Sequence, residues 1–212
     1  MSATPMDDLV LALVDLSGSM AGQSAATVRA QIQELCAELI SAEPYARNEI
    51  RFGILGFHET AEWLVPTQDV KAITGLPLLQ IQKDAAGFYR ASSFVALLDK
   101  LCSDLNGKML CGARPIRTLH LILFSDLLPT DAEAPLRDAL ARFEQLPICA
   151  HRQFYRYLVC DPSSRKAQFR KDWLQKGFLG ENGSTADPSS FSALVGQICT
   201  VINNNSQVDF QF

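Results

Sequence analysis

Three nearly uninterrupted apolar runs constrain the fold of this chain most. They are LVLALVDL (9–16), TLHLILF (118–124) and FYRYLVC (154–160). A strand with one face in water alternates apolar and polar residues, whereas a strand covered on both faces does not need to. The runs therefore predict central strands of a sheet that is buried between two layers of helices.

Helical periodicity between these runs supplies the covering layers. The segments with apolar residues three and four apart are Ser24–Ile40, Ser92–Leu105, Thr130–Leu146, Ser163–Gly177 and Ser189–Ile202. In the helix from Thr130, the acidic Asp131 and Glu133 are expected in the first turn. Strand and helix thus alternate along the chain.

Four smaller features complete the expected architecture. Residues 50–66 predict a hairpin that turns at His58–Thr60, and Phe178–Leu179 predict a short edge strand. Residues 67–91 are expected to be irregular or partly helical. Together these features indicate a doubly wound α/β fold: a mainly parallel sheet with one antiparallel edge strand and helices on both faces. We expect residues 1–205 to form one domain and residues 206–212 a loose polar tail.

Charge and composition exclude several classes of function. Nineteen basic and twenty-three acidic residues give a net charge of −4, without the basic stripe that would follow a nucleic acid backbone. No apolar run approaches the roughly 20 residues that cross a bilayer, and the acidic start MSATPMDD does not resemble a secretory leader. We therefore expect a cytoplasmic protein that binds neither nucleic acid nor membrane.

Cysteine and histidine usage does not indicate a zinc site or a disulfide framework. The six cysteines are scattered without a CxxC pair, and the three histidines show no ligand spacing against them. We expect free thiols in a reducing cytosol. The sequence gives no indication of an oligomeric state.

Carboxylates and hydroxyls follow the apolar runs at three separate places. Asp15, Ser17 and Ser19 follow the first run, Asp126 follows the second, and Ser92 opens a helix. Because ligands bind beyond the carboxyl ends of the strands in doubly wound sheets, these groups are expected to meet at one edge. An all-oxygen set suits a divalent cation, Mg²⁺ first, with Mn²⁺ and Ca²⁺ as alternatives.

A purely structural interpretation competes with the metal site. Asp15, Ser17 and Ser19 are also suited to cap the helix that begins near Ser24, and Asp126 to begin a turn before Pro129. The coincidence of three segments favours the metal. Without a cation, Asp15 and Asp126 would bring two like charges together, which raises a carboxyl pKa and costs stability.

These residues resemble a known motif. D-L-S-G-S at 15–19, a serine at Ser92 where threonine is common, and F-S-D at 124–126 resemble the metal-ion-dependent adhesion site of von Willebrand factor A (VWA) domains. The segments PYARNEIRFGILGF, SFVALLDKLC and DPSSRKAQF look most like stand-alone bacterial TerY-type proteins, which are associated with tellurite resistance and with stress or conflict gene clusters.

The resemblance implies a ligand set and a partner. Ser17 and Ser19 would be direct hydroxyl ligands, Ser92 would replace the usual threonine, and Asp15 and Asp126 would bind directly or through water. The remaining position would be open to water or to an Asp or Glu of another protein. Such a domain is a metal-dependent docking surface.

Three departures from the family pattern concern the rim of the site. Ser93 stands next to Ser92 as a possible substitute ligand, and the usual T-D-G reads Ser125-Asp126-Leu127, which adds apolar surface. Arg90 follows Phe88 and Tyr89 and either selects a partner or pairs with Asp84. The candidate partner contacts are therefore Arg90, Ser93 and Leu127. Asp161 is expected on the same face, with a turn as the competing interpretation, and His58 and Trp63 are expected to be structural.

Three hypotheses follow for function. The first is a non-enzymatic, metal-dependent interaction module that binds a partner carboxylate, within a bacterial stress-response, tellurite-resistance or conflict-type system. The second is a VWA-shaped scaffold that binds through another surface and keeps a structural metal. The third is an aspartate-based phosphotransfer enzyme. Such enzymes carry a D-x-D motif after the first strand, whereas here residue 17, where the second aspartate of that motif would stand, is serine.

Overall fold

The computed structural model describes residues 6–20, 23–45, 49–76, 87, 90–106, 115–150, 153–159, 176–180, 183–187 and 189–205. Six strands form one sheet in the order β3-β2-β1-β4-β5-β6. Their bounds are β1 Asp7–Asp15, β2 Glu49–Phe57, β3 Ala61–Asp69, β4 Ile116–Phe124, β5 Phe154–Val159 and β6 Gly183–Ala186. Only the β2–β3 pair of this sheet is antiparallel; β1 pairs in parallel with both β2 and β4.

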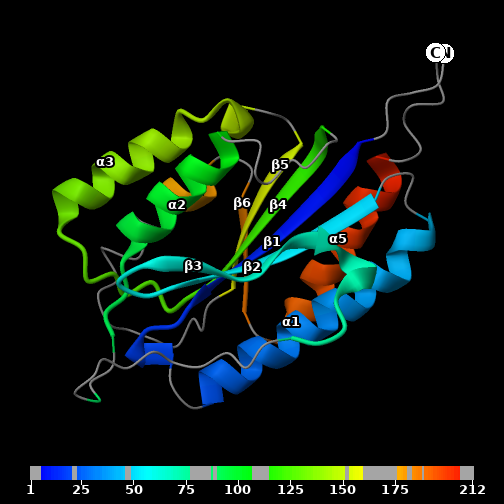
Figure 1. Cartoon of the computed structure of the whole chain (residues 1–212), viewed down its shortest axis with the longest axis horizontal. Helices are drawn as coiled ribbons and strands as arrows, with labels where there is room; N and C mark the ends of the chain where they lie inside the picture. The colour runs from blue at the N-terminus through cyan, green and yellow to red at the C-terminus, as the bar shows by residue number, and fades with distance from the viewer. Residues whose placement is uncertain are drawn as a thin grey trace.

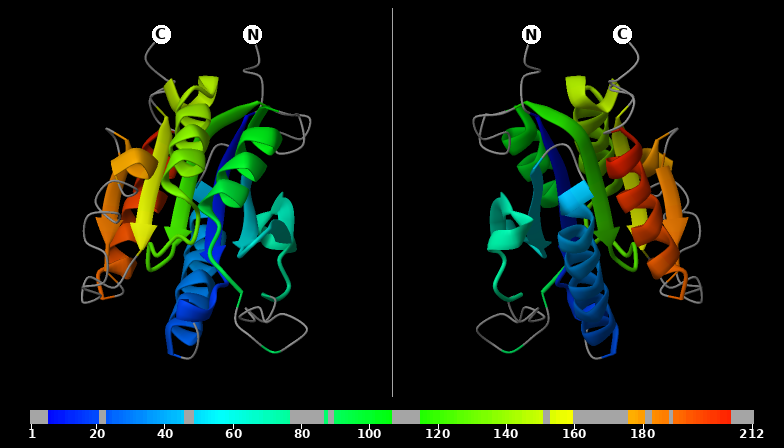
Figure 2. Two further views of the ribbon diagram at one scale, coloured as in Figure 1. Left: turned by 90° about the vertical axis from the view of Figure 1, so that its left-hand side faces the viewer. Right: turned by 90° about the vertical axis from the view of Figure 1, so that its right-hand side faces the viewer.

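Four long helices within the described residues cover the two faces of the sheet (Figure 1). Their bounds are α1 Gln23–Ala42, α2 Phe94–Asn106, α3 Glu133–Glu144 and α5 Phe191–Asn205. Figure 2 shows α2 and α3 in front of the sheet from one side, and α1 and α5 in front of it from the other. Helices on both faces explain why the central strands need no polar face.

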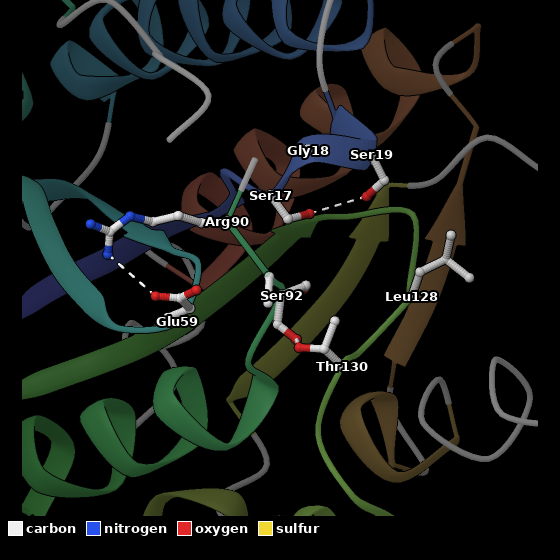
Figure 3. Close-up of a pocket in the computed structure, with 9 residues that line it drawn as sticks. Ser17, Gly18, Ser19, Glu59, Arg90, Ser92, Leu128 and Thr130 are labelled. Carbon is white, nitrogen blue, oxygen red and sulfur yellow. Dashed lines mark hydrogen bonds and ion pairs between the residues drawn. The ribbon is translucent and has the colours of Figure 1, made fainter. Parts of the chain in front are cut away.

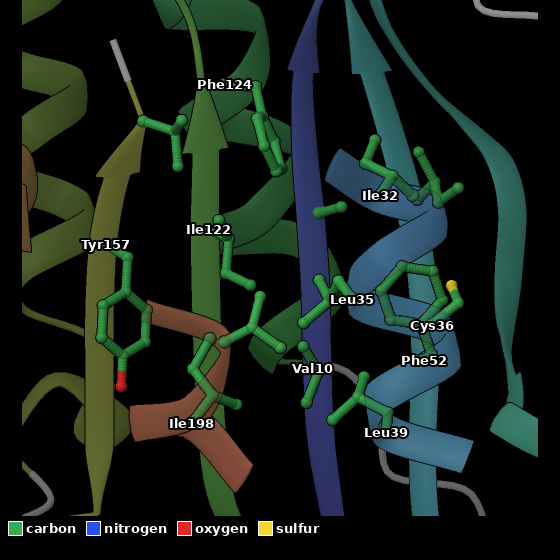
Figure 4. Packing of buried hydrophobic residues seen from close by; sticks show 14 of the residues in the cluster. Val10, Ile32, Leu35, Cys36, Leu39, Phe52, Ile122, Phe124, Tyr157 and Ile198 are labelled. Carbon is green, nitrogen blue, oxygen red and sulfur yellow. The ribbon is translucent and has the colours of Figure 1, made fainter. Parts of the chain in front are cut away.

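Successive residues of β1 contribute to two separate cores. Val10, Ala12 and Val14 pack with α1 and α5, whereas Leu9, Leu11 and Leu13 pack with α2 and α3, and all six are at most 2% exposed. Figure 4 shows the first core, in which Val10, Leu35, Ile122 and Ile198 come from four different elements. The alternation follows from the strand period of two residues.

The architecture predicted from the sequence is confirmed: a mainly parallel, doubly wound sheet with one antiparallel edge strand. The hairpin with its turn at His58–Thr60 is also confirmed. Four cysteines of the described segments are free thiols: Cys36, Cys102, Cys149 and Cys199. No helix within the described ranges is long and apolar enough to span a membrane.

Three local predictions need correction. Phe178 and Leu179 are helical, and Phe178 stacks on Phe143 of α3, so the edge strand lies further on, at β6. The hairpin strand β3 continues to Asp69, into the segment that was expected to be irregular. Helix α3 begins at Glu133 rather than Thr130. Residues 163–175 of the helix expected at 163–177 lie outside the described residues. Cys111, Cys160 and the tail at 206–212 lie outside them as well.

A buried ion pair lies at the opposite end of the sheet from the predicted site. Asp8 of β1 is fully buried and accepts hydrogen bonds from Arg117 Nε at 3.2 Å and Nη2 at 3.0 Å, and from Thr118 Oγ1 at 2.5 Å. Arg117 Nη2 also donates to the carbonyl of Ile202 in α5 at 3.0 Å. This pair ties the two central strands to the last helix.

Arg117→Met is expected to lower the free energy of unfolding by about 3–5 kcal/mol, because it leaves the Asp8 carboxylate buried without its counter-charge. Urea denaturation measures this loss. The matched control is Arg137→Met, which removes an exposed pair with Glu133 on α3 and should change stability by less than about 0.5 kcal/mol. Equal losses in the two variants would contradict the buried pair.

Candidate metal and partner site

The predicted residues come together where the chain connections leave β1 and β4 for opposite faces of the sheet. Asp15 is the last residue of β1, and Ser125 directly follows β4. Ser92 lies in the short segment before α2. This is the crevice at the carboxyl ends of the strands where doubly wound folds bind ligands.

The Asp15 carboxylate is the centre of a hydrogen-bond network. Its Oδ1 accepts from the backbone N–H of Ser17 at 3.0 Å, and its Oδ2 accepts from Ser92 Oγ at 3.0 Å and from Ser125 Oγ at 2.8 Å. The Asp15 side chain is 1% exposed. Three separate segments of the chain therefore meet on one buried carboxylate.

Burial dominates the electrostatics of Asp15. Desolvation raises the pKa of its carboxyl group above the ordinary value, and the nearby charge of Asp126 adds to the rise. The hydrogen bonds from Ser17 and Ser125 act in the opposite direction. Among the residues that the structure describes, no basic side chain forms an ion pair with Asp15. The Asp15 carboxylate is thus not neutralised by an ion pair within that part of the chain.

The hydroxyl groups of the predicted set lie over this carboxylate. A cavity of about 430 Å³ is lined by Ser17, Gly18, Ser19, Glu59, Arg90, Ala91, Ser92, Leu128 and Thr130 (Figure 3). Ser17 Oγ and Ser19 Oγ are 3.1 Å apart. Of the five predicted ligands, Ser17, Ser19 and Ser92 line the cavity and Asp15 lies behind Ser92.

Asp126 has two roles in the structure. Its charge is close enough to act on Asp15, and its Oδ1 accepts a hydrogen bond from the backbone N–H of Leu128 at 3.2 Å. The second contact is the turn that the structural interpretation expected. Because this bond uses Oδ1 and the residue is partly exposed, the turn does not exclude a further role for Asp126.

Backbone hydrogen bonds fix the loops around the cavity to one another. The N–H of Gly18 donates to the carbonyl of Arg90 at 3.3 Å, and the N–H of Ser93 donates to the carbonyl of His58 at 2.7 Å. Both the N–H and the Oγ1 of Thr130 donate to the carbonyl of Ser92, at 2.8 and 2.9 Å. Ser92 is therefore placed by its neighbours on both sides.

Asp131 caps a different helix from the one expected. Its carboxylate accepts hydrogen bonds from the N–H groups of Phe94 at 2.6 Å and Val95 at 3.3 Å, which begin α2, and from Ser93 Oγ at 2.7 Å. The prediction that Asp131 lies in the first turn of α3 is therefore wrong. The side chain crosses to the positive end of the neighbouring helix.

Two predicted partner contacts are engaged inside the protein. Ser93 Oγ donates to Asp131 and accepts from the N–H of Ala96 at 3.1 Å, as an N-cap of α2 does. Leu127 is 1% exposed and packs in the core beneath α2 and α3, so it adds no apolar surface. Leu128 lines the cavity instead.

Leu127 adopts an unusual backbone conformation in the turn after β4. Its φ of 58° lies in the left-handed region, which an L-residue seldom adopts. The N–H of Leu127 donates to Ser125 Oγ at 3.0 Å, and its side chain is buried. Packing and this hydrogen bond offset the backbone strain.

Arg90, the third predicted contact, lies at the rim. Its Nη1 is 3.4 Å from Glu59 Oε2, a pairing that the sequence did not suggest, and Asp84 lies outside the described residues together with Phe88, Tyr89 and Asp161. Two hairpin residues are structural as expected. His58 Nδ1 accepts from the N–H of Thr60 at 3.3 Å, and Trp63 Nε1 donates to Asp104 at 2.9 Å.

The donor set fits a hard divalent cation in two respects. The separation of Ser17 Oγ and Ser19 Oγ, 3.1 Å, is close to the roughly 3 Å between adjacent ligands in an octahedron with bonds of about 2.1 Å. Among the described residues, no basic side chain pairs with the buried Asp15 carboxylate. In the described part of the chain, no group of three or more His, Cys, Asp or Glu side chains is arranged to hold a metal. The candidate set combines three serines with Asp15 and Asp126.

Solved structures share this fold over nearly the whole chain. The vWF domain of the type V pili tip protein Mfa5 from Porphyromonas gingivalis has 12% identity and a TM-score of 0.61, with 97% of each chain covered. The ArnB paralog VWA2 from Sulfolobus acidocaldarius has 15% identity and a TM-score of 0.52, and the match covers 92% of this chain and 46% of that one. The chain thus has the fold of von Willebrand factor A domains.

Other matches are to parts of longer proteins. The pilus adhesin SpaC from Lactobacillus rhamnosus GG has 12% identity and a TM-score of 0.66, and the match covers 97% of this chain but 31% of SpaC. The chain likewise spans 49% of the proximal thread matrix protein 1 from the mussel byssus. No family model and no curated protein matches the sequence.

Asp131→Ala is expected to lower the free energy of unfolding by about 1–2 kcal/mol, because the first N–H groups of α2 lose their acceptor. Hydrogen exchange tests the assignment directly: the amides of Phe94 and Val95 should exchange faster, whereas the Leu136 amide in the first turn of α3 should not change. The control Glu133→Ala should leave Phe94 unaffected. Faster exchange in α3 alone would contradict the cap.

In the metal-free protein, the stability of Asp15→Asn relative to the wild type is expected to increase with pH. The raised folded pKa means that the folded state binds the Asp15 proton more tightly than the unfolded state. The wild type therefore loses stability, relative to the variant, as the pH rises from about 4 through the folded pKa, and the difference is constant above it. Urea denaturation in EDTA across this pH range measures the difference, and a pH-independent difference would contradict the shift.

Proposed function

We propose that this protein is a non-catalytic interaction module that binds another protein through a divalent cation, most favourably Mg²⁺. The observation that carries the proposal is the arrangement of Ser17, Ser19 and Ser92. All three residues line one cavity, and Ser92 Oγ donates a hydrogen bond to the buried Asp15 carboxylate. A cation and then a partner carboxylate suit that order of groups.

The residues that would hold the cation are Ser17, Ser19, Ser92, Asp15 and Asp126. When bound, the cation would supply positive charge between two carboxylates that otherwise repel each other, and would attract an acidic group from outside. The cavity volume of about 430 Å³ is large beside the roughly 30 Å³ of a water molecule, so an Asp or Glu side chain of a partner has room to enter.

The names of the similar structures support a role in protein contacts. Mfa5 is called a pilus tip protein and SpaC a pilus adhesin. The cellular part of the proposal rests on the sequence resemblance to TerY-type proteins: a cytoplasmic module in a bacterial stress-response, tellurite-resistance or conflict system. That part can fail while the docking mechanism still holds.

The burial of Asp15 argues against a phosphotransfer role. A nucleophilic aspartate needs an accessible oxygen, but Asp15 is 1% exposed and both of its oxygens accept hydrogen bonds. The same network also agrees with a purely structural role, because Asp15 has hydrogen-bond partners without any metal. Both remaining hypotheses keep a metal, so the metal dependence of partner binding separates them.

Mg²⁺ or Mn²⁺ is expected to raise the melting temperature of the wild type by several degrees, because a ligand that binds only the folded state adds about 2.7 kcal/mol at one hundred times its Kd. Ser17→Ala and Asp126→Ala should reduce or abolish this rise. Ser41→Ala is the matched control, since Ser41 bonds only within the exposed face of α1 in the described structure. A rise of equal size in all variants would contradict the site.

A partner should bind only when the cation is present. Affinity capture from the source cell, in Mg²⁺ and in EDTA, with mass spectrometry of the bound proteins, measures this dependence. We expect a protein that is retained by the wild type and by Ser41→Ala in Mg²⁺ and is lost in EDTA or with Asp126→Ala. A partner set that ignores both changes would favour the scaffold hypothesis.

A further inference from the structure

A second charged group faces the same cavity as the serine hydroxyls. Arg90 and Glu59 line it beside Ser17 and Ser92, and Figure 3 shows the pair on the side of the cavity away from Leu128. Neither residue belongs to the Asp15 network. The pair therefore needs an explanation of its own.

The backbone of Arg90 is fixed while its side chain is weakly held. Its carbonyl accepts the hydrogen bond from Gly18, which ties the residue to the loop after β1. The side chain is 33% exposed, and Nη1 is 3.4 Å from a Glu59 carboxylate that is 53% exposed. An exposed pair with one long contact contributes little to stability.

Within the described residues, the guanidinium of Arg90 has donors without an acceptor. Its Nε is shielded from solvent and has no hydrogen-bond partner, and Glu59 is the acceptor that the described residues provide for this side chain. A shielded N–H without an acceptor costs free energy. Arginine binds carboxylates best through two parallel N–H bonds, so the present contact uses only part of its capacity.

Glu59 lies in the hairpin turn and supplies a carboxylate at the same cavity. An acidic group entering from outside would meet the same guanidinium with better geometry, and Glu59 would be displaced into solvent, where it is already largely exposed. Glu59 is thus an internal stand-in for an external acid. Because the two carboxylates compete for Arg90, removing the Arg90 guanidinium should weaken binding of the external acid, whereas removing the Glu59 charge should strengthen it.

We propose that Arg90 is a second acid-binding subsite, so that the preferred partner segment carries two acidic residues: one for the cation and one for Arg90. This inference rests on the proposed function, because the first acid is the one that the cation binds. Arg90 determines specificity by recognising the second carboxylate, and Glu59 weakens binding by competing for it.

The test uses blocked peptides and the full 212-residue chain, labelled with ¹⁵N and observed by NMR in Mg²⁺. One series has two aspartates separated by none to four glycines, and a matched series replaces the second aspartate with asparagine. The best two-acid peptide is expected to bind the wild type about tenfold more tightly than its matched peptide. A tenfold difference in Kd is near the lower end of what one charge-assisted hydrogen bond contributes.

Three variants separate recognition from structure. Arg90→Ala should reduce the tenfold preference to about one while leaving the Mg²⁺ response of the protein unchanged, because it keeps the carbonyl that binds Gly18. Arg90→Lys should keep part of the preference, since it retains the charge but loses the paired donors. Glu59→Gln should tighten binding of the two-acid peptide. Loss of binding in Glu59→Gln would overturn the stand-in role.

The outcomes distinguish this inference from the function on which it rests. If the one-acid peptides bind equally in Mg²⁺ and in EDTA, the cation mechanism fails, whatever Arg90 does. If their binding depends on Mg²⁺ but the wild type shows no preference for two acids, or Arg90→Ala keeps that preference, the second subsite is overturned alone. If none of the peptides binds, both proposals are overturned.

Discussion

The site depends on one buried carboxylate that is held by neutral donors. Asp15 ends the central strand, where neighbouring strands and helices exclude water, and its hydrogen bonds come from Ser17, Ser92 and Ser125. Neutral donors satisfy the oxygens but do not compensate the charge, which is why burial raises the pKa of the group. The fold thus maintains a local deficit of positive charge at the end of the strand where ligands enter.

The loops that carry the hydroxyls are fixed by contacts between elements that are distant in sequence. Asp131 of the loop after β4 caps α2, Thr130 binds the carbonyl of Ser92, and Gly18 binds that of Arg90. Each contact joins two of the three segments that surround the cavity. The hydroxyl positions therefore depend on the packing of the whole edge and not on any one loop.

The apolar runs were sufficient to predict the central strands β1, β4 and β5, because strands covered on both faces can remain apolar at every position. The rule that ligands bind beyond the carboxyl ends of the strands then predicted that Ser17, Ser19 and Ser92 lie together. The roles of Ser125 and Asp131 were not predictable in the same way, since a serine after a strand and an acidic residue before a helix suit many local roles. Their partners are set by how β4 and α2 lie side by side, as is the pairing of Asp8 with Arg117.

The charges around the cavity also suggest an order of binding. Asp15 and Asp126 lie near each other without a compensating cation among the described residues, so an acidic segment approaching the bare site meets two like charges. A divalent cation would balance those two charges, and the partly exposed Arg90 would remain as a positive group that lines the cavity. Its weak contact with Glu59 keeps that charge partly neutralised until a stronger acceptor arrives. A partner acid would therefore follow the cation, and a single exposed arginine would then be enough to favour a second carboxylate.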